Sequence, residues 1–256
     1  MKRHRVIPVL LLAQHGLVKT KQFRNPQYLG DPINAVRIFN EKQVDELILL
    51  DIEASTKRRI DFDWIEDIVS EAFMPIAYGG GINSLAQCEQ LFARGVEKIV
   101  VNTAAVERPA LIGEVAGRFG SQAVVVSIDA RRNFWGEYRA YIRGGRKDSG
   151  RDPVALAREV EAAGAGEILI TDTEREGSFT GYDLGLLRSV SGAVRIPVVA
   201  HGGAGCIDHF RQAIAEGGCS AVAAGSMFVF AAKDEGVLIS YPSPVELEQR
   251  LWTQTN

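Results

Sequence analysis

The chain has 256 residues and a formal net charge of −3, with 46% hydrophobic and 24% charged residues. This length and composition suit one large α/β domain with a substantial core and exclude an intrinsically disordered chain. The charge balance gives no electrostatic basis for binding nucleic acid, and no apolar run approaches the roughly 18 residues of a membrane span.

Short apolar runs, most of them continuous, alternate with amphipathic stretches along the whole chain. Continuous apolar runs are typical of parallel strands that helices cover. The predicted strands are 5–11, 46–51, 75–78, 98–102, 123–129, 167–171, 196–200 and 220–224. Helix start and stop signals predict helices over 31–44, 84–95, 152–164 and 207–218. Eight such units predict an α/β fold, a single TIM (β/α)8 barrel over residues 1–256, with a doubly wound open sheet as the alternative.

The sequence repeats itself with a period of about half its length. Three pairs of segments match: "DELILLDIEAS" with "GEILITDTERE", "MPIAYGGGIN" with "IPVVAHGGAG", and "KIVVNTAAV" with "AVAAGSMFV". The second pair aligns Gly79 with Gly202, and the third aligns Thr103 with Ser226. The repeat predicts two half-barrels, approximately residues 1–120 and 121–256, and favours a closed barrel over an open sheet.

Glycine-rich turns follow the third and seventh predicted strands, each just before a helix. The turns are "GGGI" (79–82) and "GGAG" (202–205), and the next strands end in "NT" (102–103) and "GS" (225–226). Glycines allow close approach of the backbone to a ligand, and a following helix offers N–H donors to an anion. The alternative for each single turn is a simple helix cap. Two equivalent turns predict a phosphate-bearing small molecule, in the simplest case with a phosphate at each end.

Charged residues stand directly before four of the apolar runs, at the opposite ends of the strands. They are Arg5, Glu46, Lys98 and Glu167, two of each sign. One interpretation is four solvated strand starts. The other is a closed ring of salt bridges at the bottom of the barrel.

Cysteine usage indicates a reducing, cytoplasmic location. Cys88, Cys206 and Cys219 have no CxxC spacing and no histidine partners at metal-site intervals, so we expect no metal site. The apolar run near the N-terminus is short and contains Pro8, which favours a strand over a signal peptide.

These motifs together resemble the cyclase (HisF-type) subunit of imidazole glycerol phosphate synthase. The similarity runs to about residue 230, through "VIPVLLL", "PIAYGGGINS", "EKIVVNTAAVERPALI", "VVVSIDARR" and "GAGEILITDTEREGSFTGYD". It implies a duplicated TIM barrel and a lyase that receives ammonia from a glutaminase (HisH-type) subunit at the N-terminal barrel face. Ammonia crosses the barrel interior, and a bis-phosphate ribulosyl substrate yields imidazole glycerol phosphate and aminoimidazole carboxamide ribotide. The resemblance implies no cofactor.

The family's two catalytic carboxylates end the first and fifth strands. The fifth-strand partner is Asp129, whereas the first-strand position is occupied by Leu11. Leucine has no proton to exchange, so we expect cyclase activity to be impaired. Two further departures lie nearby, because Glu176 replaces the usual Asp and His201 replaces the usual Ser.

Other positions keep the family's pattern. The resemblance assigns the ring of Arg5, Glu46, Lys98 and Glu167 to the ammonia gate. It assigns phosphate or substrate binding to Lys19, Gly81, Asn102, Thr103, Thr171, Gly177, Gly202, Gly203 and Ser226. Asp51 and Asp172 end the second and sixth strands and are either secondary acid/base groups or partners of nearby loops.

The C-terminal segment 230–251 departs from the synthase pattern. "GVLISYP" resembles a divergent branch of surface-polysaccharide clusters, in which a sugar amidotransferase is a further partner; the simpler interpretation is an edge segment covering the barrel rim. The loop 134–150 contains Gly–Gly and alternating aromatics, which predicts a hairpin.

Three functions remain open at this level. The preferred hypothesis is a barrel that conducts ammonia from a glutaminase for amidation or amidination of a sugar. The first alternative is a true cyclase subunit in histidine biosynthesis. The second is a non-catalytic scaffold that activates a glutaminase, which a bulky residue in the barrel interior, such as Val126→Trp, is expected to distinguish from a conductor.

Overall fold

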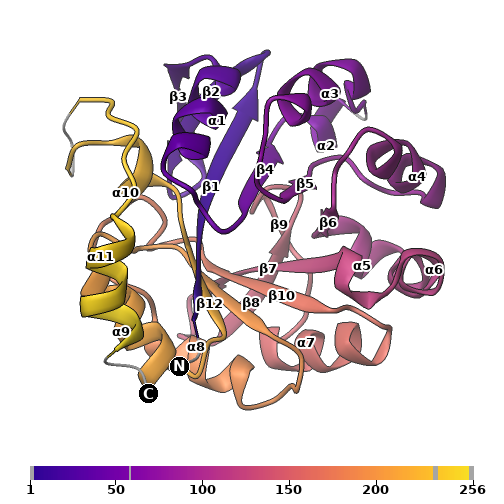
Figure 1. The fold of residues 1–256 in the computed structure, drawn as a ribbon. Helices are drawn as coiled ribbons and strands as arrows, with labels where there is room; N and C mark the ends of the chain where they lie inside the picture. The colour runs from indigo at the N-terminus through magenta and orange to yellow at the C-terminus, as the bar shows by residue number, and fades with distance from the viewer. Residues whose placement is uncertain (1–2, 58, 233–235, 254–256) are drawn as a thin grey trace.

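The computed structural model describes residues 3–57, 59–232 and 236–253 (Figure 1). Within these residues eight parallel strands close into a barrel, because β1 pairs with β12 and β7 pairs with β10. In order around the barrel they are β1 (Arg5–Ala13), β4 (Leu47–Asp51), β5 (Ile76–Gly79), β6 (Lys98–Val101), β7 (Val124–Arg132), β10 (Glu167–Asp172), β11 (Val198–His201) and β12 (Ala221–Ala224). The closed TIM barrel is confirmed, and the open sheet is excluded.

Helices form an outer layer around the strands (Figure 1). They are α1 (Pro32–Glu41), α2 (Ala54–Lys57), α3 (Phe62–Ser70), α4 (Leu85–Ala93), α5 (Thr103–Glu107), α6 (Ala110–Phe119), α7 (Pro153–Ala162), α8 (Leu184–Ser191), α9 (Ile207–Ala215), α10 (Ser226–Val229) and α11 (Pro244–Leu247). Two further short helices are the 3₁₀-helix η1 (Ser121–Ala123) and the π-helix η2 (Glu248–Trp252). The predicted helix starts are confirmed in their chemistry: Asp31 and Asp152 each accept a backbone N–H ahead of a proline at the first turn.

The barrel wall separates two apolar layers. Alternate residues of β1, such as Ile7, Val9 and Leu11, pack in the barrel interior, while their neighbours pack outward beneath the helices. On β7 the inward residue is Val125, and Val126 belongs to the outer layer. The expectation that a bulky residue at Val126 blocks the interior is therefore wrong, because the side chain that points into the barrel belongs to the neighbouring residue, Val125.

Two hairpins extend from the carboxyl ends of barrel strands. β8 (Tyr138–Ile142) and β9 (Lys147–Asp148) continue antiparallel from β7 and confirm the hairpin predicted within 134–150. The second hairpin, β2 (Gly16–Lys21) and β3 (Arg24–Gly30), follows β1 and was not predicted. Its turn places Gln22 and Phe23 at positive φ, a local conformation that the residue types do not signal.

The C-terminal segment begins beside α10, where Phe230 bridges Val237, and its last part packs beside the amino end of β1. The Tyr241 hydroxyl donates to the backbone oxygen of Val6, and Trp252 Nε1 donates to that of His4, both at 2.9 Å. Residues 4–6 therefore lie beside residues 241–252, although the two segments are far apart in the sequence. None of the helices described is both long enough and apolar enough to cross a membrane.

Candidate functional site

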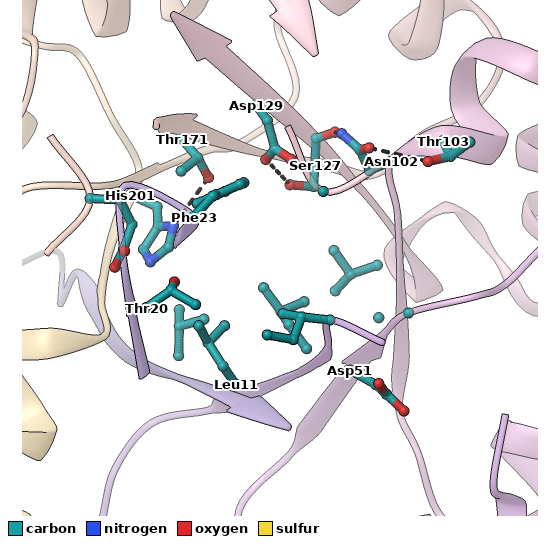
Figure 2. A pocket seen from close by; sticks show the side chains of 18 of the residues that line it. Leu11, Thr20, Phe23, Asp51, Asn102, Thr103, Ser127, Asp129, Thr171 and His201 are labelled. Carbon is teal, nitrogen blue, oxygen red and sulfur yellow. Dashed lines mark hydrogen bonds between the residues drawn. The ribbon is translucent and has the colours of Figure 1, made fainter. Parts of the chain in front are cut away.

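A cavity of about 200 Å³ opens at the carboxyl ends of the barrel strands (Figure 2). Of the residues predicted for the site, seven line it: Leu11, Lys19, Gly81, Asn102, Thr103, Asp129 and Thr171. Four others do not line it: Gly177, Gly202, Gly203 and Ser226. The structure therefore does not bring the two predicted phosphate cradles into one cavity as equal halves.

Leu11 and Asp129 lie on opposite sides of this cavity (Figure 2). Leu11 projects inward from β1 and joins Val9, Leu50 and Val100 in an apolar wall. Asp129 projects from β7, and the Ser127 hydroxyl donates to its Oδ1 at 3.1 Å. Burial raises the pKa of Asp129 to about 7, although the Ser127 bond favours the charged form. Asp129 is thus suited to exchange a proton near neutral pH, and the facing Leu11 side chain is not.

Lys19 of β2 and Glu176 of the loop after β10 form a buried ion pair in the wall of the cavity. Lys19 Nζ donates to Glu176 Oε1, and both side chains are almost completely inaccessible to solvent. The other oxygen, Glu176 Oε2, is buried and has no hydrogen-bond partner among the described residues. A buried carboxylate oxygen without a donor is unusual in native proteins, so this atom marks a place where a donor belongs.

His201 stands next to this pair, at the end of β11. Its Nδ1 lies 3.1 Å from the Thr171 hydroxyl, and strand pairing places Thr171 directly between His201 and Asp129. Burial, together with the smaller effect of the nearby Lys19 charge, lowers the pKa of His201 to about 3. His201 is consequently a neutral imidazole at physiological pH, and it lines the cavity (Figure 2).

The glycine turns after β5 and β11 share one local structure. Gly80 (φ +132°) and Gly202 (φ +90°) both need glycine, because a Cβ on either would lie 2.4 Å from a backbone oxygen, that of Asp51 or Asp172. Each of these aspartates accepts two backbone N–H groups of the turn after its own strand. These contacts align Gly80 with Gly202, so the predicted alignment of Gly79 with Gly202 was one residue out of register.

Some of the N–H donors that were expected to bind an anion already have hydrogen-bond partners within the protein. The start of α4 carries a capping box, in which Ser84 Oγ accepts from Gln87 N and Gln87 Oε1 accepts from Ser84 N. Asn102 Nδ2 donates to the backbone oxygens of Ser127 and Tyr141, which ties the β8 hairpin to the rim.

Thr103 and Arg146 complete this side of the cavity. The Thr103 hydroxyl accepts from Arg143 N at 3.0 Å and donates to Asn102 Oδ1 at 3.5 Å (Figure 2). Arg146, from the turn before β9, also lines the cavity and donates to Thr56 Oγ1.

The first hairpin covers the second predicted cradle. Gln22 N donates to Glu176 O at 3.0 Å, and Gln22 Nε2 donates to Glu174 O at 2.7 Å. Gly177 lies under Thr20 and close to the buried Ser226 hydroxyl. The loop after β10 is thus held by the hairpin, which separates Gly177 and Ser226 from the open cavity.

At the opposite end of the barrel the four predicted charges form a closed ring. Arg5 donates to both Glu46 and Glu167. Lys98 Nζ lies 2.8 Å from Glu46 and 3.3 Å from Glu167. Burial by itself would lower the pKa of Arg5. The hydrogen bonds to Glu167 and Glu46, and the negative charges of these two residues, outweigh burial and raise that pKa. The interpretation as four solvated strand starts is wrong, because both glutamates are buried and all four groups are mutually paired.

Sequence reasoning missed two features of the site. Arg146 was present in a segment noted only for its aromatics, and Phe134 and Trp135 from that segment are exposed and away from the cavity. The unpaired oxygen of Glu176 carries no sequence signal beyond the replacement of the usual Asp. In the residues described, no three His, Cys, Asp or Glu side chains are grouped as metal ligands would be.

The chain matches the protein family described as "Histidine biosynthesis protein" over residues 5–234. It is 49% identical over 249 residues to a Pseudomonas aeruginosa protein provisionally named imidazole glycerol phosphate synthase subunit hisF2, covering 97% of this chain and 99% of that one. A Leptospira borgpetersenii protein provisionally named subunit HisF is 44% identical over 250 residues, covering 97% and 98%. A Vibrio vulnificus protein provisionally named subunit hisF3 is 41% identical over 253 residues, covering 98% and 97%.

Proposed function

Because the chain belongs to the histidine biosynthesis protein family and is of the HisF type, we propose that it conducts ammonia from a glutaminase partner to its C-terminal cavity, with cyclisation disabled by Leu11. One observation carries the proposal: the barrel has a complete charged ring at its amino end and an incomplete acid/base pair at its carboxyl end. Sugar amidation or amidination through a sugar amidotransferase is the proposed fate of the nitrogen.

The ring supports entry of a small neutral base. Its four groups neutralise one another, so ammonia meets no net charge there, and the interior above it is apolar. Small inward residues such as Ala77, Ala221 and Ala223 belong to that interior. An apolar route favours NH3 over ammonium, because an ion would have to lose its hydration without a compensating partner.

The residues that face each other across the cavity support the proposal that this chain has lost the cyclisation activity. Closing an imidazole ring requires proton transfers on both sides of the reacting atoms, and general acid–base catalysis contributes about 10² to 10⁴-fold when a group is in place. Asp129 can supply one side, whereas Leu11 fills the facing position with a hydrocarbon side chain.

The first test is a cyclisation assay. Purified barrel is given ammonium salt and the family's ribulosyl-formimino bis-phosphate substrate, and imidazole glycerol phosphate is measured. We expect turnover at least 100-fold below that of a cyclase with aspartates at both positions. Turnover equal to such an enzyme would contradict the proposal and favour the histidine-biosynthetic alternative.

The second test follows the nitrogen. Barrel, glutaminase subunit, sugar amidotransferase and its sugar are supplied with amide-¹⁵N glutamine in an excess of ¹⁴N ammonium. Conduction predicts product enriched in ¹⁵N, and Ala223→Leu, which fills the interior, should remove that enrichment while glutamine hydrolysis continues. Ala224→Leu, on the outward face of the same strand, is the matched control. Product labelled only at the bulk ratio, with hydrolysis still stimulated, would favour the scaffold alternative.

A further inference from the structure

The hairpin that continues β7 presents two large aromatic side chains to solvent. Phe134 and Trp135 stand at its tip, 94% and 81% exposed, and their rings meet edge to face with centroids 5.4 Å apart. Neighbouring exposed apolar side chains mark interaction sites more often than isolated ones do, and tryptophan is enriched where partner proteins bind. The tip of this hairpin is therefore a candidate contact surface.

Hydrogen bonds within the tip hold the backbone in the conformation that displays these two rings. Asn133 Oδ1 accepts from Trp135 N and Glu137 N at 2.9 Å each, and Asn133 N donates to Glu137 O at 2.8 Å. Gly136, at φ +80°, donates its N–H to Asn133 O. A surface that is already ordered loses little conformational entropy when a partner binds, so the tip is preorganised for binding.

The same hairpin is basic, although the chain as a whole is acidic. Residues 131–151 contain seven arginine or lysine residues and two acidic residues, whereas the whole chain has a formal net charge of −3. Three carboxylates outside the hairpin pair with its arginines, those of Glu107, Glu159 and Asp183. Positive charge still exceeds negative charge when these three are counted. The aromatic tip thus belongs to a positively charged surface, which is complementary to an acidic protein surface.

The hairpin borders the mouth of the cavity at its base and stands out from it at its tip. Gly144 and Arg146 of the inner turn line the cavity, as does Asp129 of β7. From Asp129 the paired strands run on to Arg132 and Tyr138, about 10 Å farther at roughly 3.3 Å per residue. A protein interface of ordinary size, about 800 Å² on each partner, that includes the tip would therefore also reach the mouth.

Ammonia that leaves the cavity into water at neutral pH is protonated and is lost as a nucleophile, so the protein that uses it has to meet the barrel at this mouth. Resting on the proposed function, and locating its second partner, we propose that the hairpin of residues 131–151 docks the sugar amidotransferase that takes up the ammonia. This partner presents an acidic surface around its own entrance and an apolar recess for Phe134 and Trp135.

Calorimetric titration of the full chain with the sugar amidotransferase, without glutaminase, tests the proposal. Trp135→Ala should weaken binding at least tenfold, because it removes the larger aromatic anchor. Phe73→Ala is the matched control, since Phe73 is 90% exposed and precedes β5 at the amino end of the barrel, and binding should stay within twofold. Absence of binding by the natural chain, or equal binding by the natural chain and Trp135→Ala, would overturn the proposal.

A charge reversal tests the acidic character of the partner. Lys147→Glu on β9 should slow association at least fivefold at low salt and much less at high salt, because attraction between opposite charges is screened. Lys42→Glu makes the same change at an exposed lysine after α1 and should leave the association rate within twofold. Equal rates for Lys147→Glu and the natural chain at low salt would overturn the assignment of an acidic surface.

The same variants distinguish other occupants of the tip. Trp135→Ala might leave amidotransferase binding unchanged and instead abolish self-association in sedimentation velocity, or binding to vesicles of phosphatidylcholine and phosphatidylglycerol. Either result would overturn the proposal in favour of a second copy of this chain or a lipid surface. An amidotransferase that docks through the hairpin without receiving ¹⁵N removes only the proposed function. Transfer of ¹⁵N with unchanged binding in Trp135→Ala removes this inference alone.

Discussion

Leu11 and Asp129 face each other across one cavity, from strands that begin equivalent halves of the repeat (Figure 2). One is part of an apolar wall, and the other is a buried carboxyl group with a raised pKa. Substitution at position 11 therefore changes one side of the proton-transfer geometry while leaving the other side intact.

Leu11→Asp is expected to raise the kcat for cyclisation of the ribulosyl-formimino substrate by about 10² or more, because it supplies the second proton-exchanging group. The KM should change little, since none of the residues expected to bind phosphate is altered. Leu11→Asn is the control, as it has the same shape as aspartate and exchanges no proton. An equal gain in both variants would show that the hydrocarbon only obstructed the substrate.

Asp129 predicts a specific dependence of stability on pH. Burial raises its pKa from 3.8 to about 7 in the folded chain, so the folded state holds this proton more tightly than the unfolded state. Its contribution to stability is full below about pH 4 and is lost as pH rises to about 7. Asp129→Asn should therefore gain about 2–4 kcal/mol relative to the natural chain between pH 4 and pH 8.

Denaturant unfolding of both proteins from pH 4 to pH 8.5 measures this difference. Asp67→Asn, a substitution of an exposed carboxylate on α3, should track the natural chain throughout. Parallel curves for Asp129→Asn and the natural chain would show that Asp129 is charged in the folded state over the whole range.

The charged ring predicts a stability cost at the amino end of the barrel. Glu46→Gln leaves Arg5 and Lys98 with Glu167 as their one remaining carboxylate partner in the ring. Because the ring is partly buried, we expect a loss of about 3 kcal/mol in unfolding free energy. Glu71→Gln breaks the exposed pair with Arg37 and should cost under about 1 kcal/mol. Similar losses in the two variants would contradict a buried ring.

Because Lys19 and Glu176 form a buried ion pair, we expect their contributions to the free energy of unfolding to depend strongly on each other. Lys19→Met should cost about 3–5 kcal/mol, since it leaves a buried carboxylate without a cation. Adding Glu176→Leu to that variant should restore most of the loss, because two apolar side chains replace the pair. A double-mutant cycle in urea measures the coupling, and additive losses would show that the two charges do not depend on each other.

The barrel could be predicted from the residues themselves, because buried parallel strands are apolar throughout and such runs recur along the chain. A charge at Arg5 or Glu46 immediately before such a run is also visible, but composition alone left solvated strand starts open, and the family resemblance supplied the ring. The same resemblance supplied the expectation that Leu11 stands opposite Asp129.

The misses depended on geometry that residue types do not encode. Val126 was placed in the interior because a continuously apolar strand does not reveal which alternate residues face inward. The hairpin after β1 depends on positive φ at Gln22 and Phe23. The unpaired oxygen of Glu176 depends on which donors surround it in three dimensions.

The bonds from Tyr241 to Val6 and from Trp252 to His4 have a consequence for protein engineering. They tie residues 241–252 to the seam where the first and last barrel strands join, so removing either aromatic side chain would loosen that closure. Circular permutation should be milder: new ends cut at the exposed Phe134–Trp135 tip leave the seam's tether unbroken.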